Sequence, residues 1–298
     1  MNRKVDIAWE EIIKKYNILE AIKNDGKYII NAKQIKEFRE PRLMTKFDNY
    51  ESLPYIFKTN KLSILPISRS NFIISTNKIF IELPDSNSSI EHLDFPYYIQ
   101  SIIPEDITSE AIAINCSYLT GMLEDFLEDE DLFPTVSGRM SSRSFNFEIY
   151  NNISKKNDII EVENSQIEID GAYEGLKYLS LLEAKKEINS DFLIRQLYYP
   201  FRLWESKITK PIKLVFLVHT NGIFSFYEYK FKDKNNYNSL ELVKQKNYSL
   251  EDTTITTKNI QDILQNVEII DEPEIPFPQA DTFKRVINIC ELIGNNKI

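Results

Sequence analysis

Residues 167–185 read IEIDGAYEGLKYLSLLEAK and contain two apolar segments that each carry charged side chains. Asp170 ends the first segment at Gly171, where a turn is predicted, and Glu183 and Lys185 stand two positions apart in the second. Side chains alternate between the two faces of a β-strand, so Glu183 and Lys185 are predicted to share a face. If these two strands are neighbours, two carboxylates and one ammonium group meet at one end of a sheet.

Hydrolysis of a phosphodiester bond uses this combination of groups. Mg²⁺ prefers hard oxygen ligands and is commonly held by one or two carboxylates together with the substrate phosphate. The metal polarises the phosphoryl oxygen and lowers the pKa of a bound water, and a nearby lysine can position that water and stabilise negative charge. The alternative interpretation is a surface charge network at a sheet edge. Glu228-Tyr229-Lys230 repeats the Glu-x-Lys spacing, but no aspartate stands between Glu205 and Glu228.

The segment resembles the signature of the PD-(D/E)XK nucleases, in which an acid at a strand end precedes Glu-x-Lys on the next strand. Ile169-Asp170 replaces the proline-aspartate pair of that signature. The sequence FLIRQLYYP at residues 192–200 resembles the helix that often supplies a glutamine near the active site. Three further stretches are similar to prokaryotic type II restriction endonucleases: REPRLM at 39–44, GRMSS at 138–142 and PFPQAD at 276–281.

This resemblance implies a restriction-endonuclease-like core, an α/β (α+β) mixed sheet flanked by helices, which cuts double-stranded DNA at a specific sequence with Mg²⁺. Asp170 and Glu183 would be the metal ligands, Lys185 would position the attacking water, and Gln196 would be a secondary catalytic residue. Glu168 shares a strand face with Asp170 and is the reserve ligand. A homodimer is expected, because cutting both strands of a palindromic site needs two related active sites.

Two basic clusters are candidates for contact with DNA. Residues 33–46 carry five basic and two acidic side chains, and residues 138–156 carry four basic side chains and one acidic. Short polar and basic segments of this kind suit phosphates or guanine edges, although each cluster alone is also typical of a solvated face. The candidate DNA-binding residues are Arg139, Ser141, Ser142 and Arg143, and, in the first cluster, Arg39, Arg42 and Lys46.

The chain is predicted to divide into an N-terminal module, residues 1–105, and a nuclease domain, residues 106–298. The module is expected to recognise DNA or to mediate dimerisation. Apolar spacing predicts a helix over 7–23 that ends at Gly26, a strand over 28–30 and a second helix over 32–38. Short strands are predicted over 64–67, 71–75 and 78–83. Two helices with basic residues on the second are typical of a helical, winged-helix-like module.

The second domain is predicted to alternate helices and strands. The expected elements are a helix over 108–127, strands over 158–170 and 178–185, a helix over 192–204, and strands over 213–219 and 224–231. Pro200 predicts a kink or an early end in its helix. Asn221-Gly222 between the last two strands predicts a tight hairpin.

Composition excludes several other classes. The 298 residues, 42% apolar and 27% charged, are those of a globular protein. No glycine-rich phosphate-binding motif occurs, so no nucleotide cofactor is expected.

No apolar run is long enough to cross a membrane and the N-terminus lacks a signal segment, which predicts a cytoplasmic protein without a membrane partner. Cys116 and Cys290 are expected to be reduced, and two histidines exclude a histidine-rich zinc site. The net charge of −9 is a weak objection to DNA binding, because binding depends on local fields.

Two alternative functions remain open at this point. A modification-dependent or repair nuclease would share the same core, with the N-terminal module selecting the substrate. A DNA-binding regulator would use the helix-turn-helix on an inactive core. The intact set of two acids and one lysine counts against the regulator, because an inactive core has no need for all three.

Overall fold

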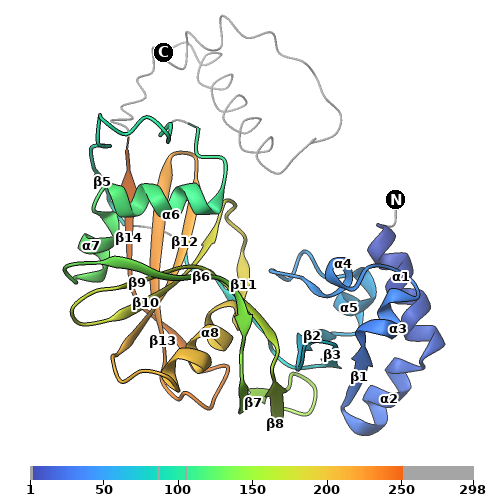
Figure 1. The fold of residues 1–298 in the computed structure, drawn as a ribbon. Helices are drawn as coiled ribbons and strands as arrows, with labels where there is room; N and C mark the ends of the chain where they lie inside the picture. Colours follow the sequence, from blue (N-terminus) through green and yellow to red (C-terminus); the bar gives the residue numbers. More distant parts are fainter. Residues whose placement is uncertain (1–2, 86–87, 105, 251–298) are drawn as a thin grey trace, which may run out of the picture. The chain divides into compact units, whose positions relative to one another are not determined.

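The computed structural model describes residues 3–85, 88–104 and 106–250, and its central element is a seven-stranded sheet of mixed orientation (Figure 1). The strand order is β5-β14-β13-β12-β10-β9-β6. These strands are β5 (Ile90–His92), β6 (Phe133–Ser141), β9 (Gln166–Glu174), β10 (Leu179–Lys185), β12 (Ile212–Thr220), β13 (Ile223–Phe231) and β14 (Leu240–Ser249). The predicted mixed class of helices and sheet is confirmed. The PFPQAD stretch at 276–281 and Cys290 lie outside the described residues.

Helices cover both faces of this sheet. On one face, α6 (Glu110–Leu119) and α7 (Met122–Leu127) share an apolar cluster with alternate residues of β10, β12 and β13. On the other face lies α8 (Arg195–Glu205), which follows the short strand β11 (Asp191–Leu193). β10 and β12 are parallel neighbours, and such a pair needs a crossover, which β11 and α8 supply.

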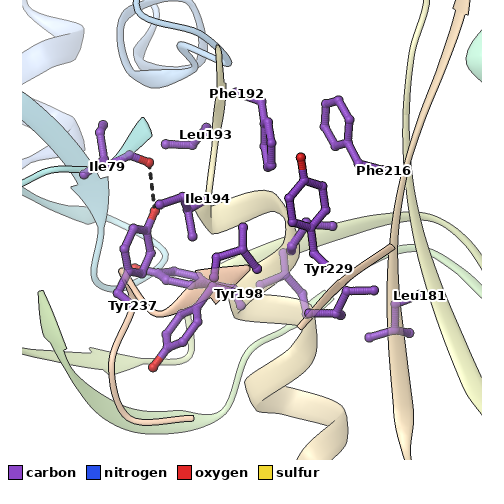
Figure 2. Close-up of a cluster of buried hydrophobic side chains, with 14 of the residues drawn as sticks. Ile79, Leu181, Phe192, Leu193, Ile194, Tyr198, Phe216, Tyr229 and Tyr237 are labelled. Carbon is purple, nitrogen blue, oxygen red and sulfur yellow. Dashed lines mark hydrogen bonds between the residues drawn. The ribbon is translucent and has the colours of Figure 1, made fainter. Parts of the chain in front are cut away.

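The cluster on the α8 face is rich in aromatic side chains (Figure 2). The ring of Phe192 stacks on that of Phe216, with centroids 4.3 Å apart. The hydroxyl of Tyr237 donates to the carbonyl of Ile79 at 3.5 Å, the contact drawn in Figure 2. This cluster fixes α8 against the sheet, and the first turn of α8 carries one of the predicted catalytic residues.

The N-terminal part forms helices around a small antiparallel sheet of strand order β1-β3-β2, drawn in blue in Figure 1. Its elements are α1 (Lys4–Lys15), α2 (Ile18–Asp25), β1 (Lys27–Asn31), α3 (Ala32–Lys36), α4 (Pro41–Thr45), α5 (Tyr55–Thr59), β2 (Ser63–Pro66) and β3 (Asn71–Ser75). It has a core of its own around Trp9 and Phe57, whose rings lie 4.7 Å apart. The predicted glycine cap is confirmed, since Gly26 ends α2 with a φ of 75°.

Two strands of residues 1–105 pair with partners in the rest of the chain. β4 (Phe80–Glu82) pairs with β11, and β5 pairs with β14. The remaining strands, β7 (Ser144–Tyr150) and β8 (Asn157–Glu163), form an antiparallel pair. Within the described ranges, no helix has both the length and the apolar character needed to cross a membrane.

Several predicted elements are divided in the structure. The helix predicted over 7–23 breaks at Asn17, the helix over 108–127 breaks at Gly121, and the strand over 158–170 breaks at Asn164. Each of these residues has a positive φ, which a continuous helix or strand cannot contain. The helix predicted from residue 192 begins at Arg195 and continues through Pro200 to Glu205, so it does not end early at the proline.

The prediction that Asp170 ends its strand was also wrong, because β9 continues through Gly171 to Glu174. A Cβ atom on Gly171 would lie 3.3 Å from Cγ2 of Ile114 on α6. This glycine therefore serves a close approach of helix to strand rather than a turn. The hairpin at Asn221-Gly222 is confirmed, with φ of 52° and 73° between β12 and β13.

Candidate active site

Glu183 and Lys185 lie on the same face of β10 and form an ion pair. Lys185 Nζ is 2.5 Å from Glu183 Oε1, and the two side chains are only 17% and 9% exposed. Leu182 and Ala184, between and beside them, belong to the apolar cluster on the α6 face. The predicted alternation along this strand is therefore confirmed.

Asp170 and Gln196 lie beside this pair. β9 runs antiparallel to β10, and Gly171 lies opposite Leu182. Asp170, one residue earlier on β9, therefore lies beside Glu183 on β10. Asp170 Oδ2 accepts a hydrogen bond from the backbone N–H of Ala184 at 2.9 Å. Gln196, in the first turn of α8, donates from Nε2 to Glu183 Oε1. The structure thus brings together the four predicted catalytic residues.

Two further carboxylates, which the sequence analysis did not identify, interact electrostatically with these residues. Glu110 is half-buried at the start of α6, and its charge interacts with those of Asp170 and Lys185. Asp48 of the N-terminal part interacts electrostatically with Lys185, and its Oδ1 is buried without a hydrogen-bond partner in the described residues. An acid in the first turn of a helix is common for its favourable dipole interaction, so Glu110 carried no functional signal.

Two glutamates and the lysine of this group have pKa values above their ordinary ranges. Burial raises the pKa of Glu183 to about 8, with the Lys185 charge opposing the rise and the Asp170 charge adding to it. The pKa of Glu110 is raised first by burial, against the Lys185 charge, and further by Asp170 and Asp48. Burial lowers the pKa of Lys185, but Glu183 and Asp48 more than offset it, so this pKa lies above its ordinary value. Burial is thus the largest cause of the raised pKa of both glutamates, and the charges of the neighbouring aspartates add to it.

The donor set is compatible with Mg²⁺. Among the described residues, no group of three or more histidine, cysteine, aspartate or glutamate side chains is arranged as a metal site by itself. Mg²⁺ usually takes one or two carboxylates and completes its shell with waters and phosphate. Asp170 and Glu183 supply such a pair, and Gln196 Oε1 is a buried acceptor that has no partner in this part of the chain. The residues present therefore fit a cation that is shared with a substrate.

These side chains line a cleft of about 560 Å³ that also carries basic residues. Besides Lys185, the cationic residues of its lining are Arg42, Lys46, Arg69, Arg139 and Arg195. Arg139 Nε lies 3.3 Å from Glu168 Oε1, so the reserve ligand of the sequence prediction is in an ion pair. The cleft thus has an acidic interior beside several cationic side chains, an arrangement that suits a polyanion.

The other predicted DNA-binding residues lie apart from the lining of this cleft. Ser142 is 1% exposed, and its hydroxyl donates to the carbonyl of Arg143 and accepts from the N–H of Ser165. Ser141 donates to Asn164 Oδ1 at 3.1 Å. These two serines therefore stabilise neighbouring turns. Arg39 is half-buried, and Arg143 is exposed with a φ of 59°.

Two cations of the lining were missed by the sequence analysis. Arg69 lies in the turn between β2 and β3, and Arg195 is the first residue of α8. Each is an isolated arginine in the sequence, outside the two basic clusters. Only tertiary packing brings them to the acids, so no local pattern could have identified them.

Comparison with known families divides the chain close to the end of β3. A family model described as a domain of unknown function, DUF6997, matches residues 75–249, and a second one, DUF6996, matches residues 6–74. No curated protein and no solved structure matches the chain. The acids and the lysine on β9 and β10 fall in the first of these segments, whereas Arg42, Lys46 and Arg69 fall in the second.

Proposed function

Because the chain belongs to the DUF6997 family, whose function is unknown, its activity is inferred from its site, and we propose that it is a Mg²⁺-dependent type II restriction endonuclease. It hydrolyses phosphodiester bonds of double-stranded DNA at a specific sequence. Asp170 and Glu183 hold the metal, Lys185 assists the attacking water, and Gln196 orients Glu183. The proposed fold of this part is the restriction-endonuclease-like core.

One observation carries the proposal: the buried ion pair of Glu183 and Lys185 lies beside Asp170 inside a cleft that cationic side chains surround. A purely structural ion pair would be expected to balance its charges, because an uncompensated buried charge is costly. Here a single lysine faces several carboxylates, and burial together with the charge of Asp170 raises the pKa of Glu183 to about 8. A bound cation would supply the missing positive charge.

The chain's own residues have separable roles in this reaction. When bound, Mg²⁺ would polarise the phosphoryl oxygen and acidify a water. Lys185 stays protonated, so it acts as a hydrogen-bond donor and a cation beside the developing charge rather than as a base. Asp170 is oriented by the Ala184 N–H, and Glu183 is oriented by Gln196. These contacts hold the acids in place before substrate arrives.

The N-terminal part suits a role in recognition. Helices come before β1, further helices come between β1 and β2, and β3 lies between β1 and β2 in the sheet. This order resembles that of a winged-helix module, in which the turn between the last two strands is the wing. Arg69 lies in that turn and lines the cleft. Cutting both strands of a palindromic site then requires a homodimer.

The activity is tested by digesting unmethylated phage DNA with the purified protein in Mg²⁺ and in EDTA. Discrete fragments in Mg²⁺ alone, lost in Asp170→Asn, are the expected result. Intact DNA under all conditions would contradict an endonuclease, and binding without cutting would support the DNA-binding regulator.

A modification-dependent nuclease is the second candidate. The observation that favours it is that the N-terminal part contributes to the lining of the cleft, where it could contact the DNA close to the acids. The same digestion on methylated and unmethylated DNA separates the two. Cutting confined to methylated DNA would support this second candidate.

A further inference from the structure

Three exposed cations of the N-terminal part line the cleft, and one of them, Lys46, interacts electrostatically with Glu110. Arg42 lies in α4, Lys46 directly follows that helix, and Arg69 lies in the turn between β2 and β3. All three are exposed, and no hydrogen bond or ion pair of their side chains occurs in residues 3–85, 88–104 and 106–250. By contrast, Lys58 of the same part pairs with Glu51 at 2.8 Å. Exposed cations beside a cleft attract anions.

The segment that carries Lys46 is fixed to the catalytic part. Two residues further on, the carbonyl of Asp48 accepts from the N–H of Leu193 at 2.9 Å. The N–H of Tyr50 donates to Asp191 Oδ1 at 2.9 Å. Both partners belong to β11, directly before α8. Lys46 is therefore held by the element that leads into Gln196, rather than by a flexible tether.

The segment that carries Arg69 is fixed in the same way. The carbonyl of Ile67, two residues earlier, accepts from the N–H of Glu163 at 2.8 Å. The carbonyl of Pro66 accepts from the hydroxyl of Tyr199 on α8 at 2.9 Å. Both segments of the N-terminal part are thus anchored to the catalytic part by hydrogen bonds of ordinary length.

We propose that Arg42, Lys46 and Arg69 bind the DNA phosphates that adjoin the scissile one, so that the N-terminal part holds the stretch of backbone that the acids cut. This inference rests on the proposed nuclease function. A cleft of about 560 Å³ is roughly 8 Å across if it is equidimensional, which corresponds to about two or three phosphates at 3.4 Å per nucleotide. The phosphates contacted should therefore lie within about five nucleotides of the cut.

The test places single neutral methylphosphonates along a duplex that contains the mapped cut. For the wild-type protein, the cutting rate should decrease when the methylphosphonate lies within about five nucleotides of the scissile bond. Arg42→Gln, Lys46→Gln and Arg69→Gln should each lose sensitivity at one of these positions. Each variant should also reduce, by about 1, the slope of the logarithm of the DNA-binding constant against the logarithm of the salt concentration. This binding is measured without metal, so that the DNA stays uncut. Lys14→Gln removes an exposed lysine of α1 and should change neither readout.

The outcomes separate this inference from the function on which it rests. If the wild type cuts but the positions lost in the three variants lie more than about five nucleotides from the scissile bond, this inference is overturned and the nuclease stays intact. Unchanged sensitivity in all three variants would overturn it as well. No cutting by the wild type would remove the proposed function and this inference together.

Discussion

Replacing Glu183 by glutamine should flatten the pH dependence of stability in the metal-free protein. The pKa of this carboxyl rises from an ordinary value of 4.5 to about 8 on folding. Between these values the folded protein keeps a proton that the unfolded chain releases, so stability falls as pH rises. One such proton corresponds to a slope of about 1.4 kcal/mol per pH unit. Glutamine does not titrate and removes this contribution.

The assay is urea unfolding in EDTA between about pH 5 and pH 7, with the slope of the unfolding free energy against pH compared in the two proteins. The pKa of Lys185 is raised above its ordinary range, so Lys185 stays charged throughout and adds no slope. A wild-type stability that falls with pH more steeply than that of Glu183→Gln is the expected result. Equal slopes would refute the buried, proton-binding state of Glu183.

A second arm of this experiment adds Mg²⁺. Metal ligands must be deprotonated, so binding is favoured as pH rises. Mg²⁺ should stabilise the wild type more at pH 7 than at pH 5, and should stabilise Glu183→Gln much less. A metal effect of equal size in both proteins would exclude Glu183 as a ligand.

Three other substitutions give separate outcomes. Lys185→Met should reduce the cutting rate by roughly 10² or more while the protein stays folded, because a cation beside the developing charge is lost; plasmid nicking and circular dichroism measure the two properties. Phe216→Ala should cost about 3–5 kcal/mol in urea unfolding, because the ring is 2% exposed and stacks on Phe192. Gly171→Val should cost about 1–3 kcal/mol, because its side chain would press on Ile114. It should also slow cutting by moving the adjacent aspartate. A fully active, equally stable Gly171→Val would contradict the close packing of α6 on β9.

Local patterns predicted what depends on local geometry. The spacing of Glu183 and Lys185 placed both on one strand face, and Asn221-Gly222 and Gly26 marked a hairpin and a helix end. These features depend on the two-residue period of strands and on glycine's tolerance of positive φ.

The features that the sequence did not reveal depend on tertiary packing. Gly171 was interpreted as a turn, because a glycine after an apolar run looks the same whether the chain reverses or a helix packs closely on a strand. Glu110 and Arg69 line the cleft and Asp48 interacts electrostatically with Lys185. These residues come from three separate segments, and no spacing within any of them indicates the acids on β9 and β10. Such groups are brought together only when the whole domain folds.

The most direct test of the central claim compares two buried glutamates of the same sheet. Glu183 lies in the cleft, whereas Glu228 is 8% exposed on β13 and pairs with Lys213 at 3.4 Å. Digestion of phage DNA in Mg²⁺ should be lost in Glu183→Gln and retained in Glu228→Gln, with both variants shown to be folded by thermal melting. Cutting that survives in Glu183→Gln, or that disappears in a folded Glu228→Gln, would contradict the assignment of the active site to β10.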